Sequence, residues 1–123
     1  MITPPGIIET KLFTRIWDHF GLSVDDLVAL QDLCLVQLKS APVVPGCAGV
    51  RKMRFAPVSA ASGKRSSMRL LFKYFENYDL VVMFLVYPKG AKENITADEK
   101  KEIVRAVAAV EAEFSKRFKR KNE

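Results

Sequence analysis

Residues 68–87 read MRLLFKYFENYDLVVMFLVY, two apolar runs separated by the short polar segment ENYD at residues 76–79. Apolar runs of about eight residues that are rich in aromatic and β-branched side chains and end at turn residues are typical of β-strands. We predict a strand over residues 68–75, a turn, and a second strand over residues 80–87. The second run is apolar on both faces, which indicates a central strand that is covered on both sides.

The segment upstream of this hairpin predicts a third strand. Residues 50–56, VRKMRFA, alternate so that two basic side chains fall on one face and Met53 and Phe55 on the other. A loop rich in proline and glycine precedes this strand, and a small, polar, basic loop over residues 57–67 follows it. Three strands with such short connections predict an antiparallel meander.

Two helices are predicted before the sheet. Apolar residues recur at helical spacing over residues 11–20, and Gly21 ends this pattern. Ser23, with Asp26 three residues later, has the pattern of a capping box that starts a second helix to about residue 39. We expect the two helices to form a hairpin that packs on the sheet.

The two ends of the chain are predicted to contribute further elements. Residues 7–10 are β-prone and suggest an edge strand. Thr96 and Glu99 form a second capping-box pattern, which starts a C-terminal helix with apolar residues at helical spacing. The expected fold class is therefore α+β: an N-terminal helical hairpin packed on a small antiparallel β-sheet, with a C-terminal helix.

Length and composition set the limits of this fold. With 123 residues, 49% of them hydrophobic, the chain is expected to form a single domain over residues 1–123. Residues 1–6 are expected to be flexible, and residues 116–123 to form a basic tail. The longest apolar run spans residues 80–88, whereas a membrane-spanning helix needs about 20 residues.

The cysteines and the N-terminus bear on the compartment. Cys34 and Cys47 form neither a disulfide framework nor a zinc motif, and the N-terminus lacks the pattern of a signal peptide. A cytoplasmic protein with two free thiols is therefore expected. Cys34 is predicted to lie in the core, whereas Cys47 lies in a loop that could expose it.

Positive charge is concentrated over the predicted strands. The chain has a net charge of +6, and residues 50–92 hold nine basic residues against two acidic ones. The basic residues are Arg51, Lys52, Arg54, Lys64, Arg65, Arg69, Lys73, Lys89 and Lys92. Such a distribution is the electrostatic footprint of a protein that binds a phosphate-rich partner, RNA or DNA.

The sequence lacks the familiar sets of catalytic side chains. His19 is its only histidine, and the sequence has no Ser–His–Asp order, Cys–His pair or HExxH run. Cations that flank the strands of a meander can converge at one end of the sheet, bind RNA phosphates and stabilise a pentacoordinate phosphorane. The alternative is a solvated basic face that makes only nonspecific contacts, and charge alone favours it. Tyr74 and Tyr87 could stack on bases, although core packing explains Tyr74 equally well.

Three motifs resemble those of a known family. Residues 44–55, VPGCAGVRKMRF, resemble the IPGTGGLRKIRW signature of RelE-like toxins of the HigB subgroup. Residues 63–72, GKRSSMRLLF, resemble GKRGGVRVIY, and residues 87–96, YPKGAKENIT, resemble YAKNEKENLT. The motifs have the family's order and spacing, and the resemblance extends from about residue 7 to residue 107.

The resemblance implies a small α+β toxin of a type II toxin–antitoxin module. Such toxins are typically ribosome-dependent endoribonucleases, or mRNA interferases, with a basic site that uses no metal ion and no cofactor. The partners that it implies are mRNA, the ribosome and a cognate antitoxin, a helix-turn-helix protein encoded by the adjacent gene.

The resemblance also implies roles for single residues. Lys52 and Arg54 would bind phosphate, with Lys52 a proton carrier as well. Arg69 would stabilise the scissile phosphate, and Lys89 the leaving group. These four form the predicted catalytic set. RNA binding is expected of seven further residues: Arg51, Lys64, Arg65, Lys73, Tyr74, Tyr87 and Lys92.

The sequence departs from the family pattern in three places. Residues 47–48 interrupt the GTGG motif, residues 66–67 are serines in place of the GG pair, and residues 72–73 replace a tyrosine pair. These changes keep two alternatives open. One is an inhibitor of DNA gyrase of the related ParE type, and the other is a non-catalytic module that binds RNA or a protein partner.

Overall fold

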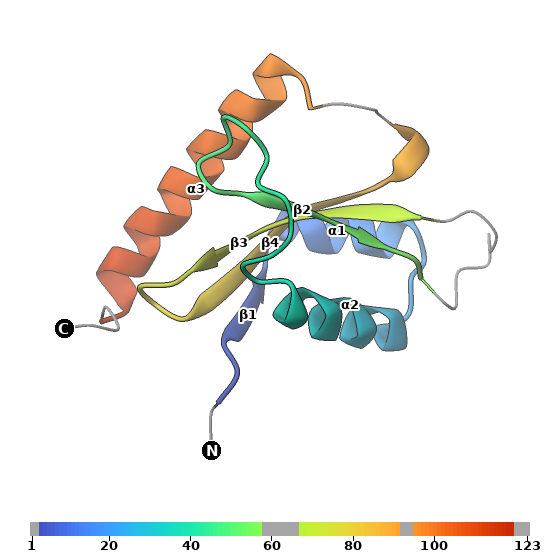
Figure 1. Ribbon diagram of the computed structural model, residues 1–123, viewed down its shortest axis with the longest axis horizontal. Helices are drawn as coiled ribbons and strands as arrows, with labels where there is room; N and C mark the ends of the chain where they lie inside the picture. Colours follow the sequence, from blue (N-terminus) through green and yellow to red (C-terminus); the bar gives the residue numbers. More distant parts are fainter. Residues whose placement is uncertain (1–2, 58–66, 92–94, 120–123) are drawn as a thin grey trace.

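The computed structural model describes residues 3–57, 67–91 and 95–119 (Figure 1). The predicted RNA-binding residues Lys64, Arg65 and Lys92 lie outside the described residues, as does most of the predicted loop over residues 57–67. The elements follow in the order β1 (Gly6–Glu9), α1 (Lys11–His19), α2 (Val24–Val36), β2 (Arg51–Phe55), β3 (Met68–Phe75), β4 (Leu80–Pro88), the short 3-10 helix η2 (Lys89–Ala91) and α3 (Ala97–Arg117).

The sheet has four strands in the order β1-β4-β3-β2. The antiparallel meander of β2, β3 and β4 is confirmed, and β4 lies inside the sheet as its apolar sequence predicted. The expectation of a wholly antiparallel sheet was wrong, because β1 pairs with β4 in parallel, from Gly6 opposite Leu80 to Glu9 opposite Met83. Gly6 is the first residue of this strand.

Each face of the sheet packs against different helices (Figure 1). One core cluster joins α1 and α2 to the face that carries Met53, Leu70, Phe72, Val81 and Met83. The other joins α3 to the face that carries Leu71, Phe75, Val82, Phe84 and Tyr87. The strands are therefore buried on both faces where helices cover them, which burial of apolar area favours.

The predicted helix starts are confirmed. Ser23 accepts a hydrogen bond from the Asp26 N–H at 3.0 Å, and Thr96 accepts one from the Glu99 N–H at 3.1 Å. Both acidic side chains bond back to the cap residue, so both capping boxes are complete. The second helix ends at Val36, earlier than predicted. A packed helical hairpin is not confirmed, because the close contacts of α1 are with β4.

The loop before β2 is folded against the sheet. Val43 forms a bridge with Arg51, and the Lys52 N–H donates to the carbonyl of Pro42 at 2.9 Å. Cys47 is only 1% exposed, so the expectation that the loop could expose it was wrong. Its burial raises the thiol pKa, an effect that nearby Lys100 partly opposes. Cys34 lies in the core as predicted, and burial raises its pKa to about 12.

Candidate functional site

Three of the predicted site residues lie in one row across the sheet. Arg54 on β2 is directly opposite Arg69 on β3, and Arg69 is directly opposite Tyr87 on β4. Because side chains alternate along a strand, Lys52 projects from the same face as Arg54. This face carries α3 at its other end, so the row occupies the part of the face that α3 leaves open.

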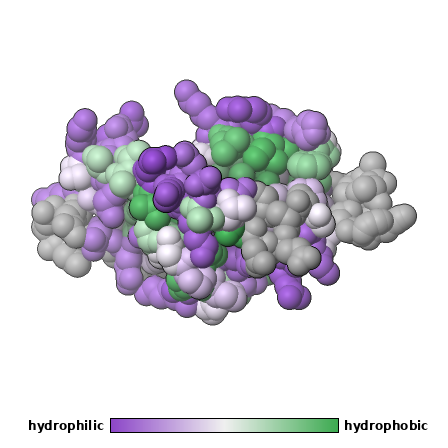
Figure 2. Space-filling view, turned by 90° about the horizontal axis from the view of Figure 1, so that it is seen from above, coloured by the Kyte–Doolittle hydropathy of each residue, from purple (hydrophilic) through white to green (hydrophobic). Residues whose placement is uncertain are grey.

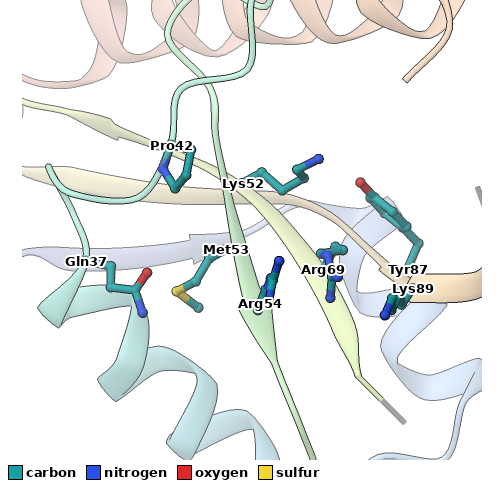
Figure 3. A pocket seen from close by; sticks show the side chains of 8 residues that line it. All are labelled: Gln37, Pro42, Lys52, Met53, Arg54, Arg69, Tyr87 and Lys89. Atoms are coloured by element: carbon teal, nitrogen blue, oxygen red, sulfur yellow. The ribbon is translucent and has the colours of Figure 1, made fainter. Parts of the chain in front are cut away.

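The row borders a cavity of about 640 Å³. Its lining consists of Gln37, Pro42, Lys52, Met53, Arg54, Arg69, Tyr87 and Lys89. The structure therefore brings together all four residues predicted as catalytic, which come from three separate segments of the sequence. Figure 3 shows Arg54 on β2 next to Arg69 on β3, with Lys89, which follows β4, beyond Arg69, and with Lys52 extending toward Tyr87.

The charge of the cavity is of one sign. Four of its lining residues are cationic, and none of the lining residues that the structure describes is acidic. Like charges placed directly opposite each other on a sheet destabilise it. A bound anion lowers the repulsion within such a cluster of cations. A guanidinium group binds phosphate through two parallel hydrogen bonds. The cavity is therefore suited to a phosphate group.

Local hydrogen bonds hold two of the cations in place. The Arg69 Nη1 donates to Ser67 Oγ at 3.0 Å and to the Met68 carbonyl at 3.3 Å. The Lys89 backbone N–H donates to the Ser67 carbonyl at 2.9 Å. Ser67 thus links the start of β3 to the end of β4: it orients the Arg69 guanidinium and anchors the backbone from which the Lys89 side chain extends.

Tyr87 separates this cavity from a second one. The second cavity, of about 460 Å³, is lined mainly by apolar residues of α1, β4 and α3. Figure 2 shows apolar patches on one side of the molecule, bordered by hydrophilic side chains. Burial raises the pKa of Tyr87, Arg69 opposes the rise, and Glu99 adds to it. The hydroxyl therefore remains protonated at neutral pH and can act as a hydrogen-bond donor.

Two predicted RNA-binding residues lie outside the cavity and bind the loop instead. The Arg51 Nη1 donates to the Ala41 carbonyl at 2.6 Å, and the Lys73 Nζ donates to the Ala48 carbonyl at 2.8 Å. The structure does not bring either into the cationic row. Their charges hold the segment between α2 and β2 against the sheet.

Tyr74 also lies away from the cavity. Its ring packs against the core cluster on the α1 and α2 side of the sheet, and its hydroxyl donates to Asp79 Oδ1 at 2.5 Å. This hydrogen bond is the main cause that raises the pKa of Tyr74 to about 12. The structure therefore supports the packing alternative for this tyrosine.

Sequence reasoning missed three residues of the cavity: Met53, which it placed only in the core, and Gln37 and Pro42. Gln37 is the C-cap of α2, and Pro42 lies in the following loop. Neither has a charge or motif that marks it, and only the position of α2 beside the sheet brings them to the cavity.

The described residues lack both a metal-binding cluster and a membrane-spanning helix. They contain no group of three or more His, Cys, Asp or Glu side chains placed to hold a metal ion. None of their helices has both the length and the apolar character needed to cross a bilayer.

The fold is similar to that of a solved toxin. No family model matches the sequence. The structure of a mutant of the E. coli toxin RelE in the free state matches with a TM-score of 0.56. The match covers 85% of this chain and 99% of that chain, at 15% sequence identity. The chain therefore has a RelE-like α+β fold.

Proposed function

We propose that this chain is the toxin of a type II toxin–antitoxin module, of the HigB subgroup of RelE-like toxins. In this proposal it is a ribosome-dependent mRNA endoribonuclease, located in the cytoplasm. The observation that carries the proposal is the cavity in which Arg54 and Arg69 lie directly opposite each other, with Lys52 and Lys89 beside them. The RelE-like fold and the three sequence motifs support the same reading.

The proposed reaction is attack by a ribose 2′-hydroxyl on the adjacent phosphorus. The bond from phosphorus to the 5′-oxygen of the next nucleotide breaks, leaving a 2′,3′-cyclic phosphate and a free 5′-hydroxyl. Arg54 and Arg69 would hold the non-bridging oxygens, whose negative charge grows in the pentacoordinate transition state. The proton of the 2′-hydroxyl would pass to Lys52, and Lys89 would stabilise the departing 5′-oxygen as it gains a proton.

The proposed partners follow from the same reading. The mRNA would lie across the cationic row, and the ribosome would present it there. A cognate antitoxin, a helix-turn-helix protein from the adjacent gene, would bind the toxin and suppress its activity. No metal ion or cofactor takes part in the proposed reaction.

The proposal is tested by expressing the chain in bacteria without an antitoxin. Growth should stop, and primer extension should find mRNA cuts that are phased with codons. Arg69→Ala and Lys52→Ala should each restore growth and remove the cuts, because each deletes one cation of the cavity. Lys101→Ala, a change at an exposed lysine of α3, is the control and should stay toxic.

Three other results would overturn the proposal. Toxicity that persists in folded Arg69→Ala and Lys52→Ala variants would show that these residues do not form the active site. Intact mRNA together with DNA-damage signalling would instead indicate a gyrase inhibitor. Binding through phosphates alone, without cleavage, would indicate a non-catalytic module, with an affinity that falls by roughly 0.7 log units per phosphate contact for each tenfold rise in salt.

A further inference from the structure

Ser67 lies immediately before β3, two residues from Arg69. It is half-buried, and its hydroxyl accepts a hydrogen bond from the Arg69 Nη1 at 3.0 Å. The resemblance to RelE-like toxins places a glycine at this position, and a glycine has no side chain that could accept such a bond. The contact between Ser67 and Arg69 is therefore a feature of this chain and not of the family pattern.

The hydrogen bonds of Arg69 involve only one edge of its guanidinium group. Nη1 has two N–H groups and two acceptors, Ser67 Oγ at 3.0 Å and the Met68 carbonyl at 3.3 Å. Within the residues that the structure describes, Nε and Nη2 donate to no protein acceptor. The edge formed by Nε and Nη2 has two parallel N–H groups, so it is the edge that remains for a bidentate ligand such as phosphate.

The Ser67 hydroxyl limits how the Arg69 side chain can turn. The second bond of Nη1 is longer and goes to the carbonyl of Met68, the residue next to Arg69 in the chain, so it constrains the guanidinium less. Arg54 lies directly opposite on β2, and its positive charge repels that of Arg69. A side chain that is already ordered loses less entropy when it binds a ligand. The hydroxyl therefore prepares Arg69 for binding.

We infer that Ser67 is a positioning residue, which holds Arg69 by Nη1 and so presents the Nε–Nη2 edge to the phosphate bound in the cationic cavity. This inference rests on the proposed function, because it takes the ligand to be a phosphate of an RNA strand. The Ser67 side chain acts through Arg69 and not through Lys89. The Lys89 N–H donates to the backbone carbonyl of Ser67, which stays in place when the side chain is replaced.

The affinity for an RNA strand that cannot be cleaved tests the inference. The probe is a short 2′-O-methyl oligonucleotide, which lacks the attacking 2′-hydroxyl, and fluorescence anisotropy measures its binding. Ser67→Ala should weaken binding roughly two- to tenfold, the cost of ordering one flexible side chain on binding. Ser67→Thr keeps a hydroxyl and should bind the probe like the wild type. Ser115→Ala, at an exposed serine of α3, is the control and should also bind like the wild type.

Two backgrounds show whether Ser67 acts through Arg69. In an Arg69→Met background, Ser67→Ala should cause no further loss of affinity, because no guanidinium group remains to be oriented. In a Lys89→Ala background, Ser67→Ala should cause the same loss as in the wild type, because the bond between the two backbones is kept. Equal losses in all three backgrounds would overturn the inference.

A second measurement separates positioning from a purely structural role. In NMR spectra of the arginine guanidinium groups, Arg69 should show hindered rotation in the wild type and freer rotation in Ser67→Ala. Thermal unfolding checks that the variant is folded. Arg69 signals that are the same in both proteins would overturn the inference, even if the affinity of Ser67→Ala for the probe were lower.

The proposed function fails by a different result. If Arg69→Met binds the probe as the wild type does, Arg69 does not bind phosphate, and the proposed site is wrong. If Arg69→Met loses affinity but Ser67→Ala binds the probe like the wild type, the phosphate site stands and only the role of Ser67 is overturned.

Discussion

Arg54 and Arg69 are direct neighbours across the β2–β3 ladder, although both carry a positive charge. Opposite-charge pairs at such positions stabilise a sheet, and like charges destabilise it by a few tenths to about 1 kcal/mol. The pair is therefore expected to cost stability in the free protein, and an anion bound between the two guanidinium groups would offset that cost. This trade of stability for function is common at binding sites.

The first prediction concerns this pair. Arg54→Gln should raise the free energy of unfolding by a few tenths to about 1 kcal/mol, because it removes the repulsion. Urea unfolding at low salt measures the gain. The gain should shrink at 1 M salt, where screening acts over about 3 Å.

Lys101→Gln is the control for that measurement. It removes one positive charge from α3 at an exposed position and should change stability little. If Arg54→Gln destabilises the protein, Arg54 makes a favourable contact that outweighs its repulsion with Arg69. An anion is then not needed to offset that repulsion.

The second prediction separates two cations of β3 that look alike in the sequence. Lys73→Met should lower the free energy of unfolding by about 1 kcal/mol, because it breaks the hydrogen bond from Nζ to the Ala48 carbonyl. Its affinity for RNA and the salt dependence of that affinity should stay as in the wild type. Arg69→Met should instead weaken RNA binding and reduce the dependence of the RNA affinity on salt concentration.

Anisotropy titrations at several salt concentrations, with urea unfolding of the same samples, measure both effects. A weaker salt slope for Lys73→Met would return this lysine to the RNA-binding surface on which sequence reasoning placed it.

The third prediction concerns the backbone of the loop before β2. Ala48 has a φ of 54°, in the left-handed region that a side chain with a Cβ disfavours by about 1–2 kcal/mol. The resemblance places a glycine of the GTGG motif at this position. Ala48→Gly should raise the free energy of unfolding by about 0.5–1 kcal/mol, after the greater entropy of glycine in the unfolded chain is subtracted.

Gly49→Ala is the opposite test in the same loop. Gly49 has a φ of 87°, and a Cβ there would lie 3.3 Å from the Lys73 Nζ. This variant should be less stable than the wild type, as judged by thermal unfolding. A stabilised Gly49→Ala, or a destabilised Ala48→Gly, would mean that the loop adopts another conformation.

The sequence predicted what depends on local pattern. The alternation in residues 50–56 correctly placed Met53 and Phe55 in the core and Lys52 and Arg54 on the other face. The same alternation puts Arg51 on the face of Met53. The sequence therefore already indicated that Arg51 would not lie in the row with Arg54 and Arg69. Capping patterns likewise located the starts of α2 and α3, because a cap is a contact between residues three apart.

What the sequence could not predict depends on contacts between distant segments. The direction of β1 is set by its pairing with β4, and a β-prone stretch carries no sign of direction. The hydrogen bond from Lys73 to the Ala48 carbonyl depends on where the segment between α2 and β2 lies. The position of Gln37 at the cavity depends on the same segment. Cys47 is buried for the same reason.

The fourth prediction concerns thiol chemistry. Cys34 is fully buried and Cys47 is 1% exposed, and burial raises the pKa of both thiols. Because only the thiolate reacts readily, neither cysteine should react with a thiol reagent such as DTNB in the native protein at pH 8. Both should react at once in guanidinium. Fast reaction of one thiol under native conditions, located by mass spectrometry, would show that its segment opens locally.

The last prediction concerns pH. Tyr74 donates to Asp79, and this hydrogen bond, with burial and nearby carboxylates, raises its pKa from the ordinary value of 10 to about 12. Between these two values the unfolded chain loses the Tyr74 proton while the folded chain keeps it. Stability therefore falls as pH rises through this window, and the contribution of the raised pKa is complete below pH 10 and absent above pH 12.

Tyr74→Phe isolates this contribution. The variant should be less stable than the wild type by about 1 kcal/mol at pH 8, because the hydrogen bond is lost and Asp79 lacks its donor. The difference should shrink as pH rises from 10 toward 12, because the unfolded wild type loses the Tyr74 proton in this range. Other groups that titrate there, lysines included, affect both proteins alike. Urea unfolding at pH 8, 10 and 11 measures the difference. A gap that stays constant across this range would show that Tyr74 contributes through packing of its ring rather than through its proton.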